Sequence, residues 1–210
     1  GESIVVPNSR KLTNGFEINI SKYSGLVSVL KRRSSKKIAN IWSQNIFAKK
    51  FSDKESFGSF FYTAKIPAVI ARQTYCLETI LLKLKIKSKS ICDVGAGEGD
   101  FLKMLNERKI SSNLFAIEPS KRNCQQLTEN KIKNFQGTIE NFSDQNKKKL
   151  FDILTVMWTM CNTSDPNKVL RSAHKLCKKN GYIVIAESSR ILVPFKKPIQ
   201  MYIPKGNPDN

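Results

Sequence analysis

The chain has 210 residues and a formal net charge of +19, from 36 Lys and Arg against 17 Asp and Glu. That length suits one α/β domain with an accessory segment, and no apolar run is long enough to span a membrane. The N-terminus has neither the basic head nor the apolar stretch of a secretory signal. The five cysteines form no C-x-x-C pair. They therefore argue against a zinc site or disulfide set and suit reduced thiols in a cytoplasmic protein.

The positive charge has two interpretations. Lysine and arginine patches neutralise phosphates, so a nucleic-acid partner is one of them. However, there are 28 Lys against 8 Arg, the basic runs are dispersed, and aromatic residues are not interleaved with them. Phosphate-binding proteins usually use arginine more than lysine, because its guanidinium group can form two parallel hydrogen bonds to a phosphate. We therefore favour a solvated surface and keep nucleic acid as an alternative.

The first 59 residues predict an accessory segment that caps the core. Residues 4–6 and 16–20 predict short strands around an Asn-Gly turn. Residues 24–33 and 35–50 predict two helices, and an apolar stripe in the second contains Trp42 and Phe47. A third helix, with an apolar face from Val69 to Leu84, precedes the core and follows Pro67.

The core opens with an apolar strand over residues 90–95, a turn with alternate glycines, and a helix over residues 99–108. The glycines Gly95, Gly97 and Gly99 let a ligand lie directly on the main chain. The third glycine comes one residue too early for the dinucleotide fingerprint, and no Gly-Lys-Ser/Thr follows as in a P-loop. Asp93, Glu98 and Asp100 would repel a phosphate and attract a cation.

The segment Asp93-Val94-Gly95-Ala96-Gly97-Glu98-Gly99 resembles motif I of the class I S-adenosylmethionine-dependent methyltransferases. The resemblance covers about residues 60–190 and implies a doubly wound, mostly parallel Rossmann-like α/β sheet. It also implies that S-adenosylmethionine binds at Asp93, Gly95, Ala96, Gly97 and Gly99. The same family carries two more strands after the fifth. Residues 191–210 are a Pro-rich tail too short to supply them, so we expect a chain truncated at its C-terminus or a sheet that closes differently.

The later segments of the chain occur in the order that this resemblance implies. The strand over residues 113–118 ends in Glu118 and Pro119, 19 residues after Gly99, where an acid can accept hydrogen bonds from ribose hydroxyls. A third strand over residues 133–137 precedes three residues that the resemblance places against adenine, namely Thr138, Ile139 and Glu140. Residues 151–160 predict a buried parallel strand. The resemblance implies that Met157 and Trp158 border the cofactor and that Trp158 also borders the acceptor.

The last helix is predicted to start at Asp165-Pro166 and to end after Asn180 at Gly181, followed by a strand over residues 182–187. Four residues are candidates for binding the methionine carboxylate or the acceptor, or for proton transfer: Tyr62, Arg72, Glu187 and Arg190. Tyr62 and Arg72 would contact the methionine carboxylate or the substrate, although Arg72 is equally a solvated residue. Glu187 is the candidate general base and Arg190 would hold an anionic acceptor. His174, the only histidine, lies away from the strand ends and is expected to be structural or solvated.

These features predict S-adenosylmethionine-dependent methyl transfer to carbon or oxygen of a small-molecule acceptor, without a metal. Two alternatives stay open, an RNA methyltransferase and an inactive cofactor-binding or interaction module. A nicotinamide-dependent oxidoreductase is disfavoured by the glycine spacing and by the acidic turn.

Overall fold

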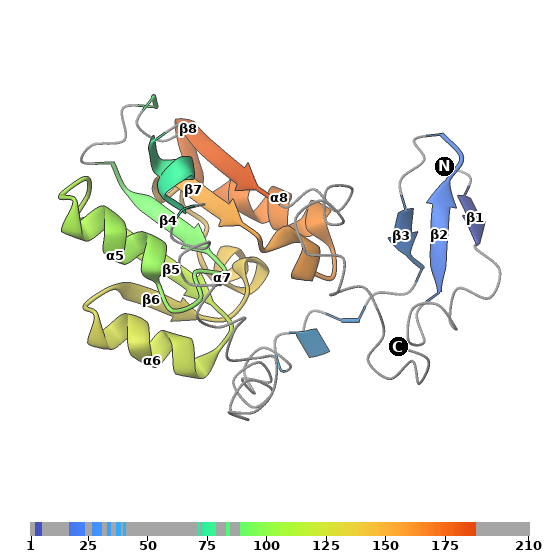
Figure 1. Ribbon diagram of the computed structural model, residues 1–210, viewed down its shortest axis with the longest axis horizontal. Coiled ribbons are helices and arrows are strands. Elements are labelled where there is room, and N and C mark those ends of the chain that lie inside the picture. The colour runs from blue at the N-terminus through green and yellow to red at the C-terminus, as the bar shows by residue number, and fades with distance from the viewer. Residues whose placement is uncertain are drawn as a thin grey trace, which may run out of the picture.

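A computed structural model describes residues 3–5, 17–23, 27–30, 33–34, 37–38, 40, 71, 73–78, 83–84 and 89–187. Within residues 89–187 it consists of a sheet with helices on both faces (Figure 1). Among the described residues, none of the helices combines the length and the apolar character that crossing a bilayer requires. The predicted Rossmann-like α/β fold is confirmed.

The sheet has the strand order β6-β5-β4-β7-β8, and each neighbouring pair is parallel. The strands are β4 (Ile91–Val94), β5 (Leu114–Glu118), β6 (Lys133–Gln136), β7 (Phe151–Met157) and β8 (Cys177–Ala186). The chain runs outward from β4 to β6, then returns to β7 on the other side of β4. Ligands of open α/β sheets bind at the carboxyl ends of the strands where the order reverses, here between β4 and β7.

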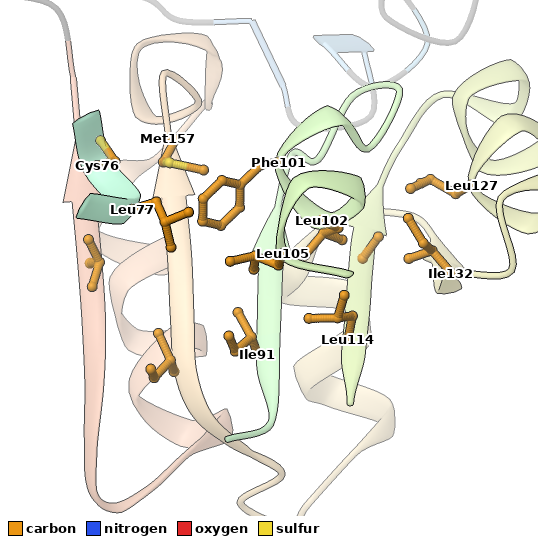
Figure 2. Close-up of a cluster of buried hydrophobic side chains, with 13 residues drawn as sticks. Cys76, Leu77, Ile91, Phe101, Leu102, Leu105, Leu114, Leu127, Ile132 and Met157 are labelled. Atoms are coloured by element: carbon orange, nitrogen blue, oxygen red, sulfur yellow. The ribbon is translucent and has the colours of Figure 1, made fainter. Parts of the chain in front are cut away.

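Two apolar clusters hold the helices on the sheet. Helix α5 (Asp100–Glu107) buries Phe101, Leu102 and Leu105 completely against the first face. Figure 2 shows these side chains together with Cys76 and Leu77 from the helical residues 73–78. Helix α6 (Lys121–Glu129) adds Leu127 to this face, whereas α7 (Ile139–Gln145) and α8 (Pro166–Leu176) cover the other.

The helix start predicted at Asp165-Pro166 is confirmed by its cap, and helix α6 starts with a cap of the same kind. The Ser120 hydroxyl accepts a hydrogen bond from the Asn123 N–H at 3.4 Å, at the start of α6. One Asp165 carboxylate oxygen accepts from the N–H groups of Asn167 and Lys168 at 2.9 and 3.1 Å, with Pro166 as the first residue of α8. These side chains satisfy N–H groups that a helix start leaves without partners.

The N-terminal segment corrects one prediction. Residues 27–29 form strand β3 (Val27–Val29), not part of a helix over residues 24–33. Together with β1 (Ser3–Val5) and β2 (Ile18–Ser21), the two predicted strands, it forms an antiparallel sheet. β-branched residues pair across it, Ile18 opposite Val29 and Ile20 opposite Val27, and this pairing outweighs the helical spacing. Residues 37–38 and 40 are helical; Trp42, Phe47 and the rest of the second predicted helix lie outside the described residues.

The end of α8 is a second correction. The helix stops at Leu176 instead of continuing to Asn180, and β8 begins at once with Cys177 in an extended conformation. Cys177 pairs with Phe151 of β7, and the Leu150 N–H donates to the Leu176 carbonyl at 2.8 Å. An irregularity between Phe151 and Ile153 accommodates the extra residues of β8. Pairing with β7 therefore ends the helix before its predicted glycine stop.

Candidate cofactor site

The three glycines after β4 all have positive φ angles, but for different reasons. A Cβ on Gly95 would lie 2.4 Å from Thr159 Oγ1, and one on Gly99 would lie 2.4 Å from Leu127 Cδ2. A Cβ on Gly97, by contrast, would have no atom within 4 Å. Gly95 and Gly99 are therefore required by packing, whereas Gly97 presents bare main chain to open space.

That open space belongs to a cavity of about 250 Å³ at the carboxyl ends of the strands. Nine of the predicted site residues line it: Gly95, Gly97, Glu118, Pro119, Thr138, Ile139, Glu140, Met157 and Trp158. Asp93, Ala96, Gly99 and Glu187 are described but do not line it. Tyr62, Arg72 and Arg190 lie outside the described residues. The structure thus brings the predicted loop, ribose and adenine residues around one space.

Glu118 ties the glycine turn to the end of β5. It is 5% exposed, and its Oε2 accepts from the Gly97 N–H at 2.8 Å. Its Oε1 accepts from the Ser120 N–H at 2.9 Å and from Asn123 Nδ2 at 3.4 Å. Burial raises the pKa of Glu118, and the three donors oppose that rise. A carboxylate oxygen with one donor can accept more hydrogen bonds, so Glu118 is a prepositioned acceptor in the cavity wall.

Asp93 lies beneath the turn instead of in the wall. Its side chain is buried, and its Oδ1 accepts from the Thr155 hydroxyl at 2.6 Å. Burial raises the pKa of Asp93 to about 7; the Thr155 hydrogen bond opposes this and the charge of Glu118 adds to it. The acid of the glycine motif therefore acts on a ligand only through charge or through the conformation of the turn.

The turn after β7 places Trp158 at the cavity. The predicted strand over residues 151–160 ends at Met157, because Trp158 has a φ of 52°. Its N–H donates to the Ala186 carbonyl at 2.7 Å, and the Met160 N–H donates to Glu187 Oε1 at 2.5 Å. A bulky residue in this region costs about 1–3 kcal/mol, and such strain concentrates at functional sites. Glu187, an exposed residue, thus holds the start of η2 (Met160–Asn162).

Several lining residues were missed from the sequence: Ile38, Asn123, Gly137, Thr159, Asn162, Thr163, Ser164 and Val169. Asn162, Thr163 and Ser164 belong to the connection between β7 and α8. Their only signal in the sequence is their place after the carboxyl end of a core strand, where binding loops lie. Ile38 has no signal at all, because it comes from the N-terminal segment.

The charge of the cavity is opposite to that of the chain. Its described lining contains the carboxylates Glu118 and Glu140 and no Lys, Arg or His. Within the described residues, moreover, no group of three His, Cys, Asp or Glu is placed to hold a metal ion. A ligand that carries positive charge, hydroxyls and no phosphate fits this lining, and S-adenosylmethionine has these properties. The exposed main chain at Gly97 is a second feature, besides the charge of the lining, that fits S-adenosylmethionine.

Comparison with known proteins identifies the family. A family model described as a methyltransferase domain matches residues 69–200. No curated protein matches the chain. Among solved structures, a proposed sarcosine dimethylglycine methyltransferase from Galdieria sulphuraria has a TM-score of 0.50 at 14% identity, over 55% of this chain and 46% of that one. This similarity supports the fold.

Two further structures are similar. One is an S-adenosylmethionine-dependent methyltransferase from Thermotoga maritima, described as a possible histamine N-methyltransferase (22% identity, 70% of this chain, 60% of that one, TM-score 0.47). The other is such a methyltransferase from Archaeoglobus fulgidus (18% identity, 57% of this chain, 53% of that one, TM-score 0.48). The chain thus spans about half of these relatives' length. Because the family model covers more than half of its residues, the chain belongs to the class I S-adenosylmethionine-dependent methyltransferases.

Proposed function

We propose that the protein transfers a methyl group from S-adenosylmethionine to carbon or oxygen of a small-molecule acceptor. The observation that carries this proposal is the open space over Gly97, next to the prepositioned carboxylate of Glu118. The mainly apolar lining of the cavity supports a small acceptor.

Each part of the lining has a proposed role. Gly97 admits the ligand to the main chain, and Glu118 accepts hydrogen bonds from the ribose hydroxyls. Ile139 and Glu140 face the adenine edge, while Thr138 Oγ1 accepts from the Asn141 N–H at 3.4 Å and fixes the start of α7. When bound, the cofactor supplies an activated methyl group on a sulfonium. The protein's own contribution is then to orient the acceptor and exclude water, with Met157 and Trp158 as the apolar wall.

Regions beyond the described lining have proposed roles too. Residues 1–59 form an accessory cap, residues 60–190 the methyltransferase core and residues 191–210 a tail; the place of Ile38 in the lining supports the cap. Tyr62 and Arg190 contact the acceptor, and Arg72 contacts the methionine carboxylate. We also propose a reducing, cytoplasmic setting, which the buried thiols of Cys92, Cys124 and Cys177, none of them in a disulfide, support.

Calorimetric titration of the full chain tests the cofactor assignment. We expect micromolar binding of S-adenosylmethionine and no binding of NAD in a parallel titration. Binding of NAD alone would overturn the proposal. An acceptor screen then follows, with small metabolites before RNA. Methylation of RNA alone would favour an RNA methyltransferase, and cofactor binding without any methylated acceptor would favour an inactive module.

We propose Glu187 as the general base for acceptors that must lose a proton. Glu187→Gln is then expected to lower turnover about 100-fold or more with unchanged cofactor affinity, because glutamine cannot take the proton. Glu187→Ala is the matched variant, since it also removes the acceptor for the Met160 N–H. Both are made with Trp42→Phe, so that fluorescence reports Trp158 alone. If Gln retains activity and only Ala shifts the emission and lowers activity, Glu187 holds the turn and is not the base.

A further inference from the structure

A second hollow lies at the amino ends of the strands, at the end of the sheet opposite the cofactor cavity. Its lining includes Lys149, which precedes β7, and residues of the α8–β8 junction. The full lining is Lys149, His174, Cys177, Lys178, Lys179, Asn180, Gly181 and Ile183, here called the basic hollow. It contains three lysines and the only histidine, and no carboxylate. Two lysine runs that are far apart in the sequence thus meet in space.

Two of these lysines are fixed by neighbouring groups. Lys149 Nζ donates to the carbonyls of His174 and Cys177, at 3.4 and 3.0 Å, at the end of α8. Lys178 Nζ lies 3.1 Å from Asp152 Oδ2, which also accepts from the Ser90 hydroxyl and N–H at 2.6 and 2.9 Å. The Lys149 and Lys178 ammonium groups are therefore anchored at the edge of the hollow.

Other lysines around the hollow have no such partners. Lys147, Lys148, Lys175 and Lys179 are exposed, and their side chains make no hydrogen bond or ion pair with the described residues. Asp152 does not neutralise them. Burial raises its pKa, but the hydrogen bonds from Ser90 and Lys178 and the charge of Lys178 outweigh this and lower it to about 2. Asp152 is thus ionised at neutral pH and is already paired.

We propose that the basic hollow and its flanking lysines bind nucleic acid through the phosphate backbone. Lysine binds phosphate as a point charge, and contacts of this kind are independent of base sequence. An acidic protein is a poorer fit, because stable protein interfaces have an apolar and aromatic core and the only large apolar side chain in this lining is Ile183. This site is separate from the cofactor cavity and does not depend on methyl transfer.

Fluorescence anisotropy with a fluorescein-labelled 20-nucleotide oligouridylate tests the proposal on the full chain. The variant K147Q/K148Q/K179Q removes three unpaired charges from this site. We expect its affinity at 50 mM NaCl to fall at least tenfold. We also expect the slope of log affinity against log salt concentration to become shallower by about 2, which corresponds to three lost phosphate contacts on a single strand.

The matched control is K109Q/K131Q/K133Q, which removes the same charge from residues before β5 and at the start of β6, in the half of the sheet away from β8. It should keep nearly wild-type affinity for the oligonucleotide. Equal losses of oligonucleotide affinity in both triple variants, or no loss in K147Q/K148Q/K179Q, would overturn the proposal. It would also be overturned if poly-glutamate displaced the labelled oligonucleotide as strongly as unlabelled RNA of equal charge. S-adenosylmethionine affinity, measured in parallel, should be unchanged in both variants, so a failure of the cofactor assignment is recognised separately.

Discussion

Gly97→Val is expected to weaken S-adenosylmethionine binding at least 100-fold while the protein still folds. Apart from the neighbouring residues of the chain, no atom lies within 4 Å of the position where a Cβ would stand, so a side chain there would enter the space proposed for the ligand. The φ of 59° adds strain of about 1–3 kcal/mol, which a domain of this size can tolerate. Calorimetric titration measures the affinity, and a thermal melt confirms that the variant is folded.

The neighbouring glycines are the controls for this prediction. Gly95→Ala and Gly99→Ala place a methyl group 2.4 Å from Thr159 Oγ1 and from Leu127 Cδ2. Both should therefore lower the melting temperature more than Gly97→Ala does, because packed neighbours must move. If a folded Gly97→Val protein bound S-adenosylmethionine as tightly as wild type, the glycine turn would not be part of the cofactor site.

The sheet and most of the cavity lining could be predicted because their signals are local. Buried parallel strands are continuous apolar runs, and the ends of such strands meet at one edge. Glu118 was found in this way, whereas the segment from Thr138 to Glu140 was assigned through the resemblance to the methyltransferase family. The alternate glycines were recognised as a motif, but the sequence could not separate Gly97, where a Cβ would stand in open space, from Gly95 and Gly99, where a Cβ would meet Thr159 and Leu127.

What could not be predicted depends on contacts between distant residues. Strand β3 forms because Val27 and Val29 pair with β2, and α8 ends early because Cys177 pairs with Phe151. The left-handed turn at Trp158 depends on the Ala186 carbonyl, 28 residues further along the chain. Likewise, the basic hollow joins lysine runs that look dispersed in the sequence. In each case, the deciding partner becomes visible only in three dimensions.

Asp93→Asn is expected to stabilise the protein at pH 8 and to change how its stability depends on pH. Burial is the main reason that the pKa of Asp93 rises from 3.8 to about 7 in the folded protein. The folded state therefore retains a proton that the unfolded chain loses between pH 3.8 and about 7. By linkage, the free energy of unfolding falls as the pH rises through this window and levels off above it. This difference between the folded and unfolded pKa values corresponds to a loss of at most about 4 kcal/mol in the free energy of unfolding.

The asparagine variant cannot ionise, and its amide oxygen can still accept the 2.6 Å hydrogen bond from Thr155. In denaturant unfolding at pH 4, 6 and 8, the free energy of unfolding of the variant should therefore decline less with rising pH than that of the wild type. At pH 8 the variant should be more stable by about 1–4 kcal/mol.

Asp152→Asn is the contrasting control. Because the pKa of Asp152 is lowered to about 2, its ionised form stabilises the fold above pH 3.8, and that variant should be less stable than wild type at pH 8. The same decline with pH in Asp93→Asn and wild type would mean that Asp93 is ionised at little cost. The acid beneath the glycine turn would then carry a negative charge available to a cationic ligand at both pH 6 and pH 8.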